Sequence, residues 1–386
     1  MQARDLFRGL AAMCLALPVL AAPTPDPDPA LPHIETRHGS VTMPEQLIAV
    51  EGGFTTVFQA ALDKHVLPEL VASFDLVTAL PAGRGKWVIY IEGNTSPREG
   101  GVSSLLPEAN TDAGTALDRD RNGRLQVSEL HYFYPIGNNA LLVTGLLDLT
   151  STLDSSEVAN DETAQFLSGP LVNNPTIDFP DYSLGMVYNR ETGVDRGYSL
   201  ALTSSHGLAD NANASYAQLV DIGADGRGVF AAGEVQWPAV GSKLHAGIWL
   251  NSAGHAKLKG QAGTEHNYGV YLVADHPVAS GWWSLRAGLA NERTSPAGRF
   301  LSLALQQPLA DAILGLGIAY TGLSGQDTSQ HHDDMLQAEC YLRFAMYDNI
   351  SITPALQWLR NGSFDASGEP LAADQTLLSL RLNDTF

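Results

Sequence analysis

The sequence predicts an all-β fold, a transmembrane antiparallel β-barrel of about sixteen strands with short periplasmic turns and long extracellular loops. Three observations lead to this prediction. Apolar and polar residues alternate along many segments of about ten residues, the length at which a tilted strand crosses a bilayer. Short and long connections alternate between these segments, and aromatic residues lie near many of their ends. A soluble β-sandwich would share only the residue alternation.

The composition suits such a fold. The chain has 386 residues, of which 44% are hydrophobic and only 17% are charged, and it contains 37 glycines. A net charge of −20 argues against nucleic-acid binding through a broad basic surface. Beyond the N-terminus no stretch approaches the ~18 apolar residues of a transmembrane helix. A membrane-spanning chain of this kind must therefore close into a barrel, because lipid leaves no other way to satisfy backbone polar groups.

The N-terminal region predicts export. Arg4 and Arg8 precede an apolar run over residues 10–20, and small residues follow it, so we expect residues 1–21 to be a cleaved signal peptide. Residues 22–50 are rich in proline and aspartate and predict a periplasmic N-terminal segment, followed by the barrel over residues 51–386. Cleavage would remove Cys14 and leave Cys340 without an internal disulfide partner.

Sixteen segments carry the strand pattern. An even number of strands returns both ends of the barrel to the same side of the membrane, and the final strand ends in an aromatic residue, Phe386, as outer-membrane barrels usually do. Asp384 departs from that ending, where an apolar residue is expected. The predicted strands cover residues 53–62, 72–81, 86–94, 128–135, 141–150, 182–190, 197–205, 228–237, 244–252, 268–276, 282–292, 299–307, 313–322, 336–348, 350–360 and 376–386.

Several short motifs, in a fixed order, resemble the carbohydrate-selective porin family of outer-membrane proteins. The most specific is ANDETAQFLS at residues 159–168, followed by VNNP at 172–175 and FPDYSLG at 179–185, and later by ECYLR at 339–343. The resemblance covers roughly residues 50–386. It implies a sixteen-stranded pore in the bacterial outer membrane that admits small sugars, glucose among them, and it is compatible with a homo-oligomer. Periodicity and composition by themselves do not predict sugar selectivity.

The polar positions opposite the apolar face are expected to line the water-filled lumen, because an arginine near the bilayer midplane would cost about 2–4 kcal/mol. Such side chains either exchange hydrogen bonds with the hydroxyls of a solute or pair with one another to brace the wall. The expected lining residues are Glu92, Asp148, Glu234, Gln236, Arg286, Gln306, Glu339, Arg343, Gln357 and Arg381.

The long connection at residues 151–181 carries three carboxylates, Asp154, Asp161 and Glu162. Paired carboxylates also occur in hydrolases, but no partner motif completes a catalytic set here. A nucleophile elbow, a phosphate loop and a dinucleotide fingerprint are also missing. We therefore expect a loop that folds into the barrel and narrows the pore, and no enzyme. A pore for other small solutes, such as organic acids or aromatics, remains the alternative.

Residues 118–129 match an EF-hand calcium loop at its ligand positions, with Gly123 at the turn. Calcium takes six to eight oxygen ligands, which this pattern can supply. Residues 131–134 predict a strand, so the second flanking helix of an EF-hand is missing. The sequence thus predicts a structural calcium site in an outer loop and, as a further alternative, a calcium-binding surface protein. The expected ligands are Asp118, Asp120, Asn122, Arg124 (through its carbonyl), Gln126 and Glu129.

Overall fold

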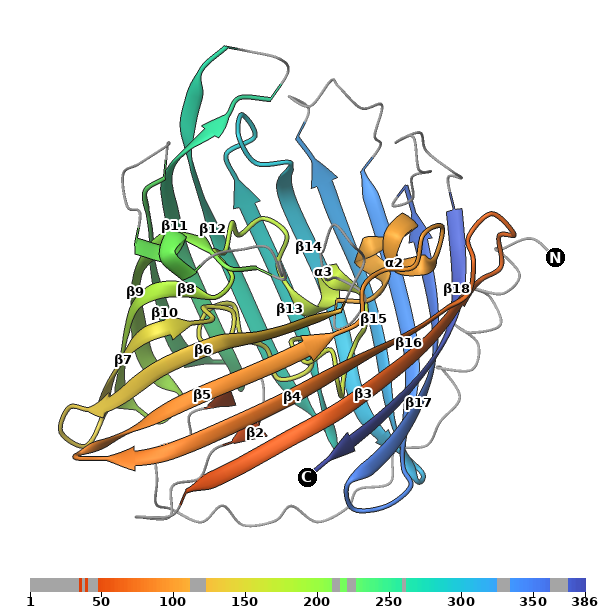
Figure 1. Ribbon diagram of the computed structural model, residues 1–386, viewed down its shortest axis with the longest axis horizontal. Helices are drawn as coiled ribbons and strands as arrows, with labels where there is room; N and C mark the ends of the chain where they lie inside the picture. The colour runs from red at the N-terminus through yellow and green to blue at the C-terminus, as the bar shows by residue number, and fades with distance from the viewer. Residues whose placement is uncertain are drawn as a thin grey trace.

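The computed structural model describes residues 35–36, 39–40, 48–111, 123–209, 216–220, 227–258, 262–324, 334–361 and 374–386. Two short strands, β1 (Glu35–Thr36) and β2 (Gly39–Ser40), pair with each other. All other described strands belong to one closed sheet, which forms a barrel (Figure 1). Within these described ranges, no helix is long and apolar enough to cross a bilayer.

The barrel has sixteen strands, and every neighbouring pair is antiparallel. The ring closes where the last strand pairs with the first, with Leu380 opposite Phe58. Each of the sixteen predicted segments overlaps one of these strands, so the predicted fold class is confirmed. The strands are β3 (Ala49–Ala61), β4 (Glu69–Ala82), β5 (Gly85–Asn94), β6 (Arg124–Pro135), β7 (Ala140–Leu147), β8 (Ser183–Gly193), β9 (Arg196–Gly207), β10 (Val229–Ala239), β11 (Ser242–Ala256), β12 (Thr264–Val278), β13 (Gly281–Ala290), β14 (Ala297–Leu309), β15 (Ala312–Leu323), β16 (Met335–Ala345), β17 (Ile350–Arg360) and β18 (Asp374–Thr385).

Short turns and longer connections alternate strictly around the barrel. The turn between β4 and β5 has only residues 83–84 and that between β10 and β11 only 240–241, whereas β5 and β6 are joined by residues 95–123 and β7 and β8 by 148–182. Both ends of the sheet lie at the short-turn end, where Gly52 and Phe386 exchange two backbone hydrogen bonds of 2.9 Å. This is the end that the sequence-based rule of short periplasmic turns assigns to the periplasm.

The two faces of the wall differ in polarity, as the alternation predicts. On β18, Leu378, Leu380 and Leu382 are exposed on the outer face, whereas Ser379 and Arg381 are buried inside the barrel. Outward apolar side chains meet lipid favourably, and inward polar ones find partners in the lumen.

The aromatic side chains follow the predicted girdle only in part. On the outer face at the short-turn end, Trp87 and Tyr132 lie with ring centroids 5.1 Å apart. Tyr90 and Trp249 instead point inward and are buried, because they occupy the same face of their strands as the lumen residues. Trp282 also faces inward, so these three residues do not belong to a girdle.

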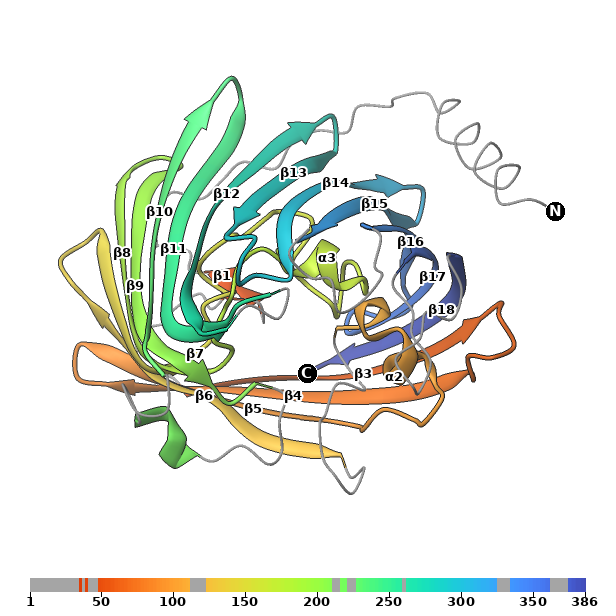
Figure 2. The same cartoon turned by 90° about the horizontal axis from the view of Figure 1, so that it is seen from above.

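Two connections fold into the barrel and fill part of its lumen (Figure 2). One contains α2 (Val102–Leu105) and the short 3-10 helix η1 (Pro107–Ala109). The other, residues 148–182, contains α3 (Gly169–Val172), and we name it the constriction loop. A third connection lies against the outside of the barrel. Its 3-10 helix η2 (Tyr216–Val220) places the Tyr216 hydroxyl against the backbone of Val127, beside a β-bulge in β6.

Candidate functional site

The structure places the expected lining residues inside the barrel. Nine occupy inward positions of the strands, and Asp148 lies one residue beyond β7, in the constriction loop rather than on a strand as expected. Most of the nine are buried rather than open to the lumen, and Arg286, Gln357 and Arg381 are at most 1% exposed. Six of the nine bind backbone groups of the infolded segments and hold those segments in place, whereas Glu92 pairs with Arg124 of β6 and Gln306 donates to the Tyr341 hydroxyl on β16.

Two groups of polar contacts fix the constriction loop to the barrel wall, and we name them the first and second anchors. Arg286 on β13 is the centre of the first anchor. Its guanidinium donates hydrogen bonds to the carbonyls of Ala159 (3.1 Å), Leu171 (3.4 Å) and Val172 (3.2 Å), and forms an ion pair with Asp154. These contacts join parts of the constriction loop that are up to eighteen residues apart in sequence. Burial raises the pKa of the Asp154 carboxyl, while the Arg286 charge beside it opposes that shift.

Two wall carboxylates, on β10 and β12, bind the same stretch of the loop. Glu234 on β10 accepts the Asp154 backbone N–H at 2.9 Å and the Tyr271 hydroxyl at 2.8 Å. Asp275 on β12 accepts the Ser156 hydroxyl at 3.1 Å and the Glu157 N–H at 3.3 Å. The beginning of the loop is therefore fixed to three strands through polar contacts.

Glu339 on β16 is the centre of the second anchor. Its buried carboxylate accepts the backbone N–H of Leu167 (3.0 Å) and of Ser168 (2.8 Å), and the amide of Gln357 (3.2 Å). The hydroxyl of Ser168 also donates to Gln337. A charged acceptor that binds two successive N–H groups fixes the local backbone strongly.

Two arginines hold the segment between these anchors. Arg381 on β18 donates to the carbonyls of Glu162 (2.6 Å) and Gln165 (2.9 Å), and Arg343 on β16 donates to the carbonyl of Ala164 (3.1 Å). The segment from 161 to 165 is thus a turn, and three of its carbonyls are held by arginines of the wall.

Glycines on the inner wall give the loop room to approach. A Cβ atom at Gly288 would lie 1.9 Å from Thr176 Oγ1, and one at Gly317 would lie 2.5 Å from a methyl group of Leu171. Phe166 and Leu171 of the loop pack with Phe300 and Tyr341 of the wall in one buried cluster. Any larger residue at these two glycines would push the loop inward.

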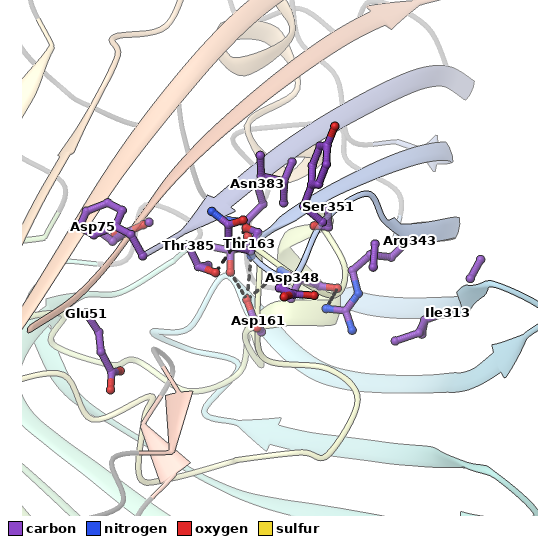
Figure 3. A pocket seen from close by; sticks show the side chains of 18 of the residues that line it. Glu51, Asp75, Asp161, Thr163, Ile313, Arg343, Asp348, Ser351, Asn383 and Thr385 are labelled. Atoms are coloured by element: carbon purple, nitrogen blue, oxygen red, sulfur yellow. Dashed lines mark hydrogen bonds between the residues drawn. The ribbon is translucent and has the colours of Figure 1, made fainter.

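A cavity of about 900 Å³ remains at the short-turn end of the barrel, and we name it the vestibule (Figure 3). Asp161, Thr163 and Ala164 of the constriction loop line it, together with residues from β3, β4, β16 and the ends of the neighbouring strands. Its ionisable lining is mainly acidic, and Arg343 is the basic residue of this lining. The acidic members are Glu51, Asp75, Asp161, Asp311 and Asp348.

The three carboxylates expected to narrow the pore have different surroundings. Asp161 lines the vestibule. Asp154 is 1% exposed and paired with Arg286, so it secures the loop instead of facing the vestibule. Glu162 contributes its backbone carbonyl to Arg381. Sequence reasoning identified the loop, but it could not separate the residue that faces water from those that fix the fold.

Sequence reasoning did not predict that residues 95–111 fold into the barrel. Gln59 and Gln357 both donate to the carbonyl of Ala109, at 3.1 and 2.8 Å, and Glu69 accepts the N–H of Ser103 at 2.7 Å. The apolar side chains of this segment pack inside the wall around Leu106. The pattern VSSLLPEA, apolar within a long polar connection, is the signal that could have revealed it.

The calcium motif is only partly described. Asp118, Asp120 and Asn122 lie outside the described residues, whereas Arg124, Gln126 and Glu129 lie on β6, which begins earlier than predicted. The sequence predicts a strand, and not a second EF-hand helix, after the loop, and β6 is that strand. Among the described residues no group of three or more His, Cys, Asp or Glu side chains is arranged to hold a metal.

Calcium binding stays a prediction that calorimetry can check. If residues 118–129 bind the ion, the folded protein should show one site, and Asp118→Ala should weaken binding strongly by removing a ligand. Asp118 is preferable to Glu129, whose carboxylate also accepts the Asp148 N–H and lies 3.2 Å from His131. Absence of both binding heat and a calcium-dependent melting shift in the wild type would exclude the site.

Comparison with known proteins identifies the architecture. OprB from Pseudomonas putida superposes with a TM-score of 0.68 at 12% sequence identity, over 88% of this chain and 94% of that one. A variant of the porin from Rhodopseudomonas blastica superposes with a TM-score of 0.52 at 10% identity, over 88% of this chain and all of that one. The barrel has the porin fold.

Sequence comparison does not assign the chain to a family. No protein-family model matches the chain. An uncharacterized protein of Aquifex aeolicus is 34% identical over 119 residues, which is 31% of this chain and 37% of that protein. The match thus spans just over a third of the length of that relative.

Proposed function

We propose that this protein is a pore in the bacterial outer membrane through which small neutral hydrophilic solutes, including carbohydrates such as glucose, diffuse. The observation that carries the proposal is the porin fold, with an apolar outer face, a polar inner face and a loop folded into the lumen. A pore of this type needs no chemical step, so the fold favours a channel over an enzyme. The motif resemblance supports the carbohydrate as solute.

The outer-membrane location rests on the same fold and on the predicted signal at residues 1–21. The mature protein should be recovered with outer-membrane lipid after cell fractionation, and it should migrate faster on gels before heating than after. Recovery in the soluble periplasmic fraction would contradict the location.

The charge of the vestibule favours a neutral solute over an organic acid. Five acidic side chains and one arginine line it, so a solute anion would meet a negative potential there. Sugars have no net charge and exchange hydrogen bonds with such carboxylates. An aromatic solute remains the second candidate, because Tyr347 and Phe386 also line the vestibule.

Swelling of liposomes that contain the purified protein tests this solute preference. We expect glucose to enter several times faster than a monocarboxylate of similar size, and we expect the difference to shrink at high salt, because salt screens the vestibule charge. Faster entry of the organic acid at low salt would refute the preference, and a lack of swelling with every solute would refute the pore.

A further inference from the structure

The outer face of the barrel carries a cluster of aromatic side chains near the short turns of β5 to β9, which are consecutive strands of the sheet (Figure 1). Its members are Trp87, Tyr132, Tyr134, Tyr188 and Tyr198. The ring centroids of Tyr132 and Tyr134 lie 6.5 Å apart, and those of Tyr188 and Tyr198 lie 6.1 Å apart. Strand pairing places Leu142 of β7 opposite both Tyr134 and Tyr188, so the rings follow one another around the outside of the wall.

Three arginines lie among these rings. The guanidinium carbon of Arg84, in the turn between β4 and β5, lies 5.7 Å from the centroid of the Tyr134 ring. Arg190 of β8 lies directly opposite Tyr198 of β9, so both side chains point to the outer face. Arg196 precedes Tyr198 by two residues on the same strand and therefore shares its face. We name these three arginines and the five rings the outer patch.

The positive charge of the outer patch is not neutralised by the protein. Among the described residues, none of the three guanidinium groups has an ion pair or a hydrogen bond. Glu191 and Asp195 are the acidic residues nearest in sequence. Glu191 follows Arg190 on the strand and so points to the opposite face, and Asp195 belongs to the turn between β8 and β9.

The remainder of the short-turn end has a different charge on its outer face. The short turns from β10 onward consist of residues 240–241, 279–280, 310–311 and 346–349, and none of these residues is Lys or Arg. Asp384 continues the outward series of Leu380 and Leu382 on β18. Within the part of the chain that the structure describes, positive charge on this end of the outer face is therefore concentrated on one sector, from the β4–β5 turn to β9.

Aromatic rings and arginines at this level of the wall match the chemistry of a lipid headgroup. Trp and Tyr favour the boundary between hydrocarbon and water, where one part of the ring is apolar and the other is wet. A guanidinium can donate two parallel hydrogen bonds to one phosphate. Phosphatidylethanolamine also carries an ammonium group, which the arginines repel, whereas phosphatidylglycerol carries only the phosphate charge and hydroxyl groups. The outer patch should therefore favour the anionic headgroup.

We propose that the outer patch is a binding site for an anionic phospholipid, with Arg84, Arg190 and Arg196 as the phosphate donors. The lipid would lie in the membrane leaflet at the short-turn end, outside the barrel and apart from the route of the solute. The proposal rests on the proposed outer-membrane location and does not depend on which solute the pore admits.

Lipid binding to the purified full chain in a nonionic detergent tests the site. Native mass spectrometry can follow a titration with phosphatidylglycerol and, separately, with phosphatidylethanolamine that has the same acyl chains. We expect the wild type to bind phosphatidylglycerol at least tenfold more tightly. Arg84→Gln, Arg190→Gln and Arg196→Gln should each weaken phosphatidylglycerol binding about fivefold, the usual effect of one basic residue at an anionic lipid surface, and should leave the other lipid unaffected.

Two further variants separate the headgroup contact from general effects. Arg360→Gln removes an exposed arginine at the long-connection end of β17, so both affinities should stay within about twofold of wild type. Arg190→Lys keeps the positive charge and should keep most of the preference, because an ammonium still attracts a phosphate. The heat-dependent gel shift verifies that each variant is folded.

Several results would overturn the lipid site. Equal affinity of the wild type for the two lipids would do so, and so would equal losses in Arg190→Gln and Arg360→Gln. An oligomer that dissociates in Arg190→Gln without a change in lipid binding would assign the outer patch to a second copy of the chain instead. Liposome swelling measures the pore independently, so each of these results would leave the proposed pore in place.

Discussion

Arg286→Ala is expected to release the constriction loop and to make the barrel markedly less stable. The substitution removes the donor to three loop carbonyls and leaves the buried Asp154 carboxylate without its cation. Removal of one partner of a buried ion pair typically costs about 3–5 kcal/mol. The temperature of the gel shift should fall, and single-channel conductance in planar bilayers should rise as the loop leaves its place.

The loss should depend on pH. Burial raises the pKa of Asp154, and without Arg286 only the hydrogen bond from Asn174 opposes that shift, so the variant can hold Asp154 protonated. A group with a raised pKa in the folded state stabilises that state at low pH and loses this contribution as pH rises through the folded pKa. The stability deficit of Arg286→Ala relative to wild type should therefore grow from acidic to neutral pH.

Arg360→Ala is the control, because Arg360 is exposed at the end of β17. It should change neither conductance nor the pH dependence. If Arg286→Ala keeps wild-type conductance and loses no more stability than Arg360→Ala, the loop is held by its apolar cluster and the polar anchor contributes little.

Gly288→Val is expected to displace the loop by steric force alone. The new Cβ would lie 1.9 Å from Thr176 Oγ1 and 2.8 Å from Asn174 Oδ1, and both side chains are buried and hydrogen-bonded to each other at 2.6 Å. Overpacking of such a site costs about 1–3 kcal/mol. Altered conductance together with a lower gel-shift temperature would be the result.

Gly233→Val separates this effect from the general consequences of valine in a strand. Gly233 lies on the outer face of β10, and a Cβ there would meet Leu200 at an ordinary 3.5 Å. Valine favours strands, so this variant should fold at least as well as wild type. Equal behaviour of the two variants would mean that the loop does not need the room at Gly288.

The strands could be predicted from the sequence because their signal is local. Leu378, Leu380 and Leu382 alternate with Ser379 and Arg381, and lipid on one side of a wall and polar groups on the other require that pattern. The ends of the strands were predicted less accurately than their positions. β7 ends at Leu147 and β16 at Ala345, each three residues before the predicted end, because the following residues belong to connections with no period.

The sequence by itself determined a closed barrel of sixteen strands and which side chains point inward, because residue alternation encodes both. Only the tertiary structure decided what the inward side chains meet. Glu339 binds Leu167, which is 172 residues away, and Arg381 binds Glu162 at a separation of 219. Alternation along a strand shows only that an arginine points inward. It does not distinguish an arginine that binds loop carbonyls from one that faces water. The difference arises from the path of an irregular loop through the lumen, and no local pattern specifies that path.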